Sequence, residues 1–185
     1  MRIIGGRSRG LHLADVGAGD AKGHLRPTSD RVREAIFNLL INGGYGDPVT
    51  GARVLDLFAG TGALGLEAIS RGAAEVLLVD DGAAALALQK RNIGLMRTEA
   101  AVSMRRDATR LGAVTGAAFD LVFLDPPYGK GMGEKALQSA ADGGWLAPEA
   151  LVVWEESVAP LVPVGFVQQD QRRYGDTLVT IVRAP

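Results

Sequence analysis

Short apolar runs alternate along most of the chain with longer segments whose apolar residues have helical spacing. We place the expected strands at residues 53–58, 75–80, 101–105, 119–125 and 151–155, and the helices between them at 63–71, 82–94 and 133–143. The run at 119–125 is almost continuously apolar, which is typical of a parallel strand buried on both faces. Strands alternating with helices predict a doubly wound, Rossmann-like α/β fold with a mostly parallel sheet.

The two ends of the chain depart from this alternation. Strands are expected near 164–169 and 177–183 with no helix between them, which predicts a terminal antiparallel hairpin. Arg172, Arg173 and Tyr174 are read as a turn, with contact to RNA as the alternative. Residues 2–13 alternate loosely and are interrupted by glycines, so they predict a small N-terminal β-hairpin.

The segment that follows this hairpin predicts a loop and then a helix. Residues 14–25 are rich in glycine, alanine and aspartate, as in a loop. Thr28 or Ser29 can cap a helix that ends at the glycines from Gly43 onward. We therefore expect a basic arm over residues 1–25 and one compact domain over 26–185.

Charge is distributed unevenly along the chain. The net charge of −1 argues against a general polyanion binder, but residues 1–33 contain seven basic and three acidic residues, so this part carries +4 and the remainder −5. This predicts a local phosphate-facing surface, although a solvated terminal segment explains the charge equally well. The candidate phosphate-binding residues are Arg2, Arg7, Arg9, Arg26 and Lys130.

Several other classes of protein are disfavoured by the sequence. Cysteine is absent, no apolar run approaches the roughly 20 residues that span a bilayer, and the N-terminus lacks the apolar core of a signal peptide. His12 and His24 have no second ligand at a suitable spacing. We expect a cytoplasmic monomer with no metal and no membrane association.

A glycine-rich turn follows the first α/β strand. In the run from Asp56 through Phe58 to Gly65, the glycines Gly60, Gly62 and Gly65 fit the dinucleotide fingerprint G-x-G-x-x-G. Asp80 lies 20 residues after Gly60, where a carboxylate can accept ribose hydroxyls. NAD and S-adenosylmethionine both suit this pattern. Asp56 favours the latter, because a negative charge in the crevice repels pyrophosphate and attracts a sulfonium, although it can instead cap the loop's own N–H groups.

Two further cofactor candidates follow the strand at 101–105. Asp107 can accept the adenine amine, with Ala108 beside it, or can form an Asx turn before the next helix.

The strand at 119–125 ends in Asp125-Pro126-Pro127-Tyr128. The prolines stiffen the turn, so the Asp125 carboxylate and the Pro126 carbonyl can accept both N–H bonds of one amine. Such bonds favour a pyramidal nitrogen whose lone pair can attack a methyl group. Tyr128 can stack on a base. These four residues are the candidate catalytic group.

Four segments of the chain resemble those of known methyltransferases. DLFAGTGALGLEAISRGA (56–73) and FLDPPYGKG (123–131) resemble class I methyltransferases that modify amines. RIIGGRSRGLHL (2–13) and LRPTSDRVREAIFNLL (25–40) closely resemble the RsmD family, the bacterial 16S rRNA guanine-N2 methyltransferases. The resemblance implies a class I methyltransferase domain over 26–185, S-adenosylmethionine as cofactor with S-adenosylhomocysteine as product, and 16S rRNA of the small ribosomal subunit, assembled or assembling, as substrate.

The resemblance also implies residue roles. Gly60 and Gly62 line the methionine end of the cofactor, Asp80 holds the ribose, Asp107 lies by the adenine, and Asp125, Pro126 and Tyr128 hold the guanine amine.

Three alternatives remain open. A DNA or protein-glutamine N-methyltransferase uses the same chemistry at the Asp-Pro-Pro-Tyr tetrapeptide. An NAD-dependent oxidoreductase explains the glycines and Asp80 but not Asp125. A non-catalytic RNA-binding module would retain the pocket without catalysing methyl transfer.

Overall fold

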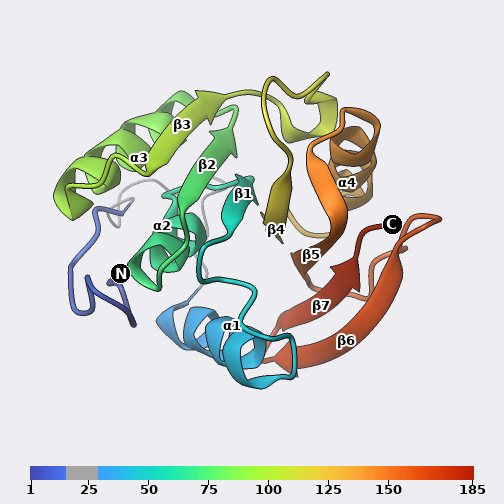
Figure 1. Cartoon of the computed structure of the whole chain (residues 1–185), viewed down its shortest axis with the longest axis horizontal. Helices are drawn as coiled ribbons and strands as arrows, with labels where there is room; N and C mark the ends of the chain where they lie inside the picture. The colour runs from blue at the N-terminus through green and yellow to red at the C-terminus, as the bar shows by residue number, and fades with distance from the viewer. Residues whose placement is uncertain (16–28) are drawn as a thin grey trace.

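The computed structural model describes residues 1–15 and 29–185 and contains one seven-stranded sheet in the order β3-β2-β1-β4-β5-β7-β6 (Figure 1). The strands are β1 (Arg53–Leu57), β2 (Glu75–Asp80), β3 (Ala101–Arg105), β4 (Phe119–Leu124), β5 (Leu146–Glu156), β6 (Val167–Tyr174) and β7 (Thr177–Arg183). The first five strands in this order, from β3 through β2, β1 and β4 to β5, are parallel, and β7 is antiparallel to both β5 and β6. The predicted doubly wound sheet with a terminal hairpin is confirmed.

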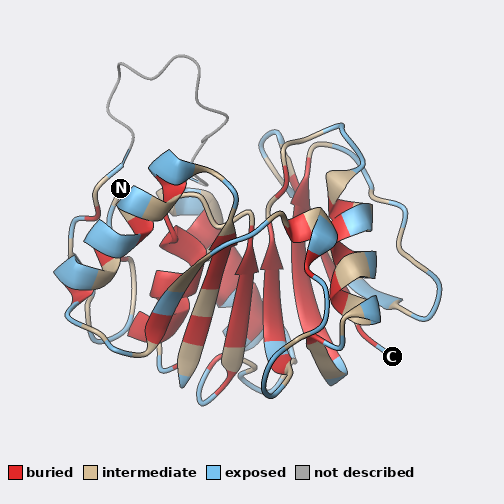
Figure 2. Cartoon of the chain, turned by 90° about the horizontal axis from the view of Figure 1, so that it is seen from above, coloured by how far each residue is buried: buried red, intermediate tan, exposed pale blue. Residues whose placement is uncertain are grey.

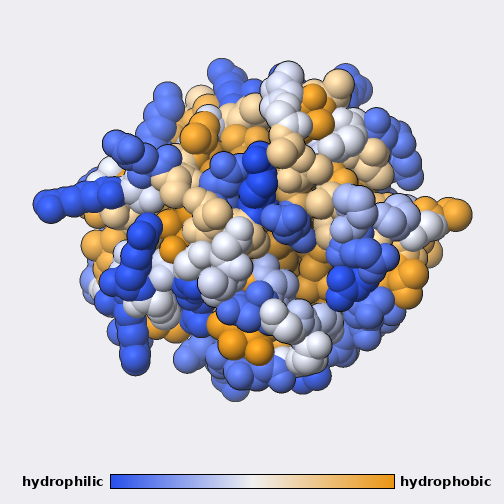
Figure 3. Space-filling view, in the orientation of Figure 1, coloured by the Kyte–Doolittle hydropathy of each residue, from blue (hydrophilic) through white to orange (hydrophobic). Residues whose placement is uncertain are grey.

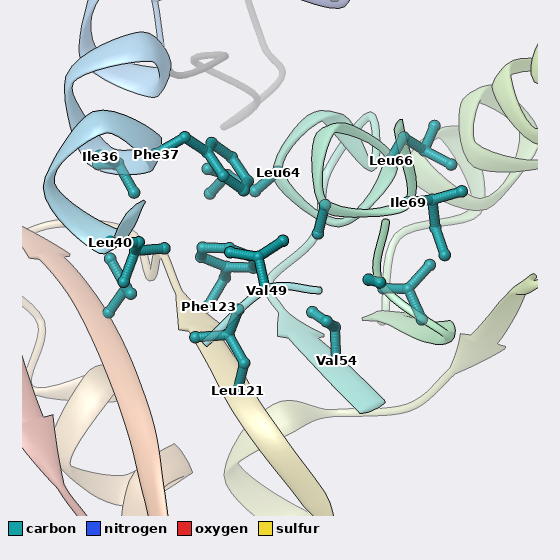
Figure 4. Packing of buried hydrophobic residues seen from close by; sticks show 14 of the residues in the cluster. Ile36, Phe37, Leu40, Val49, Val54, Leu64, Leu66, Ile69, Leu121 and Phe123 are labelled. Atoms are coloured by element: carbon teal, nitrogen blue, oxygen red, sulfur yellow. The ribbon is translucent and has the colours of Figure 1, made fainter. Parts of the chain in front are cut away.

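Helices cover both faces of the sheet, and the central strands between them are buried along most of their length (Figure 2). The helices are α1 (Asp30–Asn42), α2 (Ala63–Ser70), α3 (Ala83–Met96), α4 (Met132–Asp142) and the short 3-10 helix η1 (Ala108–Arg110). On one face, Phe37 of α1 and Ile69 of α2 belong to the same core as Phe123 of β4 (Figure 4). On the other face, Leu137 of α4 packs in one cluster with Trp154 of β5.

The first residues of the chain pack onto this domain. Arg2 and His12 form an antiparallel bridge, as the predicted hairpin requires, and Ile3 and Leu13 are buried in the core that contains α1 and α2. The carboxylate of Glu67 on α2 accepts hydrogen bonds from the backbone N–H groups of Ile4 and Gly5, each at 2.8 Å. Residues 1–15 are therefore fixed to α2 by both apolar and polar contacts.

The boundaries of two predicted strands are corrected by the structure. β6 covers Val167–Tyr174, so Arg172, Arg173 and Tyr174 lie in a strand instead of a turn. Its mostly polar sequence reflects an edge strand that pairs through backbone bonds to β7 alone. β5 covers Leu146–Glu156 instead of 151–155, and its first residues precede a register irregularity in its pairing with β4.

The helix-capping prediction is confirmed for one of its two candidates. Ser29 caps α1 by accepting a hydrogen bond from the N–H of Val32 at 3.3 Å. Thr28 and most of the predicted loop at 14–25 lie outside the described residues.

The face seen in Figure 1 is mostly hydrophilic, and its apolar atoms form separate small areas (Figure 3). Among the described residues, no helix has the length and hydropathy needed to cross a bilayer.

Candidate active site

A cleft of about 1810 Å³ opens at the carboxyl ends of the strands, where β1 and β4 lie side by side at the switch in strand order. In Figure 2 the arrowheads of the central strands point toward this edge. Pockets for single small molecules usually measure about 300–1,000 Å³. The cleft therefore has room for a cofactor and a second molecule.

The glycine-rich turn forms the part of the cleft wall after β1. Phe58 and Gly60 line the cleft and have positive φ angles of 59° and 53°. Phe58 is a non-glycine residue in a sparsely populated backbone region, which is common at binding sites. Gly62 lies behind the wall at φ 80°, and a Cβ atom there would lie 2.8 Å from Leu78. Gly62 thus allows the turn to pack on β2 and does not itself line the cleft.

Asp80 anchors the same turn from the end of β2. One carboxylate oxygen accepts the N–H of Gly60 and the other accepts the N–H of Gly82, both at 2.9 Å. Asp80 also lines the cleft. An ionised carboxylate has about four acceptor sites, so both oxygens retain capacity for a ligand's hydroxyl groups.

Asp56 lies beneath the turn and not on the cleft wall. Its side chain is buried and accepts the N–H of Gly65 at 2.8 Å, which is the loop-capping role. Burial raises the pKa of Asp56 to about 8, with the Gly65 bond opposing the shift and the charges of Asp125 and Asp80 adding to it. The expected direct projection of this carboxylate into the crevice is not seen.

We expect Asp56→Asn to remove a pH dependence of stability. The folded protein holds this proton up to about pH 8, whereas the unfolded chain loses it near 3.8. The stability due to this group is therefore complete below about pH 4 and declines as the pH rises to 8. Between pH 6 and 8, the wild type should lose about 2–3 kcal/mol more unfolding free energy than the variant in urea titrations. Equal losses would contradict this assignment.

Asp107 and Ala108 line the cleft beyond the end of β3. Asp107 caps η1, where one carboxylate oxygen accepts the hydroxyl and the N–H of Thr109 at 2.7 and 2.8 Å. The Thr109 hydroxyl is the main cause that lowers the pKa of Asp107. The Asx-turn reading is therefore correct, and the ionised carboxylate still lies on the cleft wall.

The Asp125–Tyr128 turn forms another part of the cleft wall, and all four of its residues line the cleft. The N–H of Gly129, directly after the turn, donates to Glu156 at 2.9 Å. The Tyr128 hydroxyl lies 3.3 Å from that of Thr177 on β7. Burial raises the pKa of Tyr128, as do the charges of Asp125, Glu155 and Glu156, so its phenol stays neutral.

The cleft wall combines predicted site residues with charged side chains that were not predicted. Carboxylates outnumber basic groups there, with Asp80, Asp81, Asp107, Asp125, Glu155 and Asp176 against Arg31, Arg106, Lys130 and Arg173. Glu155 had a usable signal, because it is the last residue of the strand predicted at 151–155 and must reach the same sheet edge as Asp125. Arg173 and Thr177 had none, because their proximity depends on the pairing of β6 and β7.

The candidate phosphate-binding residues are dispersed. Lys130 lines the cleft, Arg2 and Arg9 border a separate hollow of about 280 Å³, Arg7 is exposed, and Arg26 lies outside the described residues. Arg33, counted in the basic total, is fully buried and pairs with Asp30 and Glu67 at 2.9 and 3.6 Å. It contributes nothing to a phosphate-facing surface.

Comparison with known proteins identifies the family. The model of the family described as Conserved hypothetical protein 95 matches residues 1–183. Ribosomal RNA small subunit methyltransferase D of Escherichia coli is 39% identical over 169 residues, which are 90% of this chain and 81% of the relative. The chain belongs to the RsmD family. Its fold and family membership make it a class I methyltransferase, so the sequence prediction is confirmed and the oxidoreductase alternative is not favoured.

Two further comparisons agree with this assignment. The protein of the same name from Haemophilus influenzae is 33% identical over 167 residues, covering 88% of this chain and 82% of the relative. The solved structure of the putative methyltransferase yhhF from Escherichia coli has a TM-score of 0.84 and 36% identity, covering 100% of this chain and 97% of that one.

Within the described residues, no group of three or more acidic or histidine side chains is arranged to hold a metal ion.

Proposed function

We propose that this RsmD-family chain transfers a methyl group from S-adenosylmethionine to the exocyclic N2 amine of a guanine in 16S rRNA. The observation that carries the proposal is one cleft whose wall includes Gly60, Asp80 and the Asp125–Tyr128 turn. The names of the curated relatives support the RNA of the small ribosomal subunit as the substrate class.

The residues of the cleft fit the proposed cofactor. The excess of carboxylates on its wall favours a ligand with sulfonium and ammonium charges and disfavours a pyrophosphate. Asp80 would hold the ribose hydroxyls, Asp107 would accept the adenine amine, and Phe58, Gly60 and Ala108 would contact the remainder. When bound, S-adenosylmethionine supplies an electrophilic methyl group on sulfur.

The Asp125–Tyr128 turn would prepare the amine. Asp125 and the Pro126 carbonyl accept its two N–H bonds, which frees the nitrogen lone pair, and Pro127 stiffens the turn that holds both acceptors. Tyr128 would pack on the base, with its hydroxyl 3.3 Å from that of Thr177. Electrostatic preorganisation of this kind does not require a strong base, because the ammonium product loses its proton readily.

We further propose that the protein acts as a cytoplasmic monomer on the small subunit or on an assembly intermediate. Arg2, Arg7, Arg9, Arg26 and Lys130 would contact RNA phosphates.

The proposal is tested by methyl transfer from labelled cofactor to small subunits isolated from cells that lack this protein, compared with DNA. We expect label in the 16S rRNA and none in DNA. Label in DNA with none in the subunits would support the alternative of a DNA amine methyltransferase and refute the proposal.

We expect Asp80→Asn to weaken S-adenosylhomocysteine binding by about 10- to 100-fold. The change removes the charge and one acceptor that fixes the turn, and hydrogen bonds to charged groups contribute about 1.5–3 kcal/mol. Calorimetry measures the dissociation constant, with Asp120→Asn as a control on β4 away from the cleft. Equal affinity in wild type and Asp80→Asn would exclude Asp80 from the cofactor site.

A further inference from the structure

Glu155 is a buried carboxylate on the cleft wall, and the proposed function assigns it no role. It is the penultimate residue of β5, its side chain is 1% exposed, and it lines the same cleft as Asp125. A carboxylate is costly to bury, so its position at a substrate-sized cleft calls for a physical reason.

Strand register places Glu155 beside Asp125. β4 and β5 are parallel neighbours, and Leu124 pairs with Trp154 at the end of the ladder. The next residues along the two strands are Asp125 and Glu155. Neighbouring strands lie about 4.8 Å apart, and paired residues of parallel strands project to the same face. The two carboxylates therefore lie side by side at the cleft edge of the sheet.

Further contacts on the same wall are consistent with this placement. The pKa of Tyr128 is raised mainly by burial and further by the charges of Asp125 and Glu155, so both carboxylates are within electrostatic range of one phenol. The following residue, Glu156, binds the N–H of Gly129 and so ties the end of β5 to the Asp125–Tyr128 turn. β5 and the turn are thus held together as one wall.

We propose that Asp125 and Glu155 together read the edge of guanine, with Glu155 accepting the N1–H bond while Asp125 accepts an N–H bond of the N2 amine. The proposal rests on the proposed function and adds a specificity-determining residue to it. Two adjacent carboxylates repel each other, and a ligand with two adjacent N–H donors compensates that repulsion.

Among bases with an exocyclic amine, guanine alone meets this requirement. Guanine presents N1–H next to its amine, so it offers two neighbouring donors. Adenine and cytosine present an unprotonated ring nitrogen next to theirs, and this nitrogen would face the lone pairs of Glu155. A site built for a hydrogen bond rejects analogues that lack the matching group, because its buried polar atom is then left unpaired.

The test uses small subunits reconstituted with 16S rRNA in which the guanine that the wild type methylates is replaced by 2-aminopurine. This base keeps the 2-amino group but has an acceptor at N1. In single-turnover assays, we expect the wild type to methylate guanine at least about 100-fold faster than 2-aminopurine.

Glu155→Gln should shift that preference. The amide N–H₂ group can donate to N1 of 2-aminopurine, so we expect the ratio of guanine to 2-aminopurine rates to fall by at least about 10-fold. The ratio is measured within one preparation, so it does not depend on the fraction of correctly folded variant. Glu149→Gln, on an exposed part of the same strand, is the matched control and should keep the wild-type ratio.

The outcomes separate the two proposals. If the wild type methylates guanine but shows no preference over 2-aminopurine, or if Glu155→Gln lowers both rates equally, Glu155 does not read N1 and the proposed function stands. If the wild type transfers no methyl group to the guanine subunits, the proposed function itself is refuted.

Discussion

Asp125→Ala is expected to lower the rate of methyl transfer to small subunits by about 100- to 1000-fold while S-adenosylhomocysteine binds within about twofold of wild type. The substitution removes one of the two acceptors that we assign to the amine, on a wall where geometry and electrostatics provide most of the proposed catalysis. The glycine turn and Asp80, which we assign to the cofactor, keep their own hydrogen bonds.

Single-turnover transfer and calorimetry on the same preparations measure the two effects of Asp125→Ala. Asp142→Ala, an exposed aspartate at the end of α4, is the control and should retain wild-type rates. Transfer by Asp125→Ala at the wild-type rate would exclude this carboxylate from the reaction. Absence of transfer by both proteins would favour the alternative in which the cleft binds RNA without catalysis.

Glu67→Ala is expected to lower the free energy of unfolding by about 3–5 kcal/mol. Glu67 is fully buried on α2 and accepts hydrogen bonds from Ile4, Gly5 and Arg71. Its carboxylate also lies 3.6 Å from the buried guanidinium of Arg33 on α1. The substitution would leave this cation with less compensation and would release the N-terminal residues from α2.

Urea titration of Glu67→Ala measures that loss, and Glu75→Ala provides the comparison. Glu75 pairs with Arg53 at 2.8 Å on the surface, where an ion pair contributes only about 0–1 kcal/mol. Similar losses in the two variants would show that Glu67 does not join the N-terminal residues to the domain.

The order of the elements followed from the sequence because the central strands are buried on both faces and must be apolar. β2 has the predicted boundaries, and β1 and β4 each end one residue earlier than predicted. β6 was misplaced because an edge strand paired through its backbone leaves no such pattern in its side chains. β5 was predicted too short at both ends, because residues 146–149 are not buried and Glu156 lies beyond the apolar run.

The candidate site could be predicted only as far as the fold determines it. Strand ends of a parallel sheet meet at one edge, so Asp80 and Asp125 were expected in one crevice, and both line it. The sequence left two roles open for Asp56, and the hydrogen bond that it accepts from the N–H of Gly65 decides for the capping role. Arg33 looked like part of a basic arm, but α1 buries it against Glu67.

Nucleoside analysis of the methylated product tests the central claim most directly. Small subunits from cells lacking this protein are incubated with it and labelled S-adenosylmethionine, and their 16S rRNA is digested and separated by mass spectrometry. The account predicts a single labelled nucleoside, N2-methylguanosine, from one position. Label on an adenine or cytosine amine, on a ring nitrogen or on ribose would contradict the assignment of the Asp125 and Glu155 carboxylates to a guanine edge.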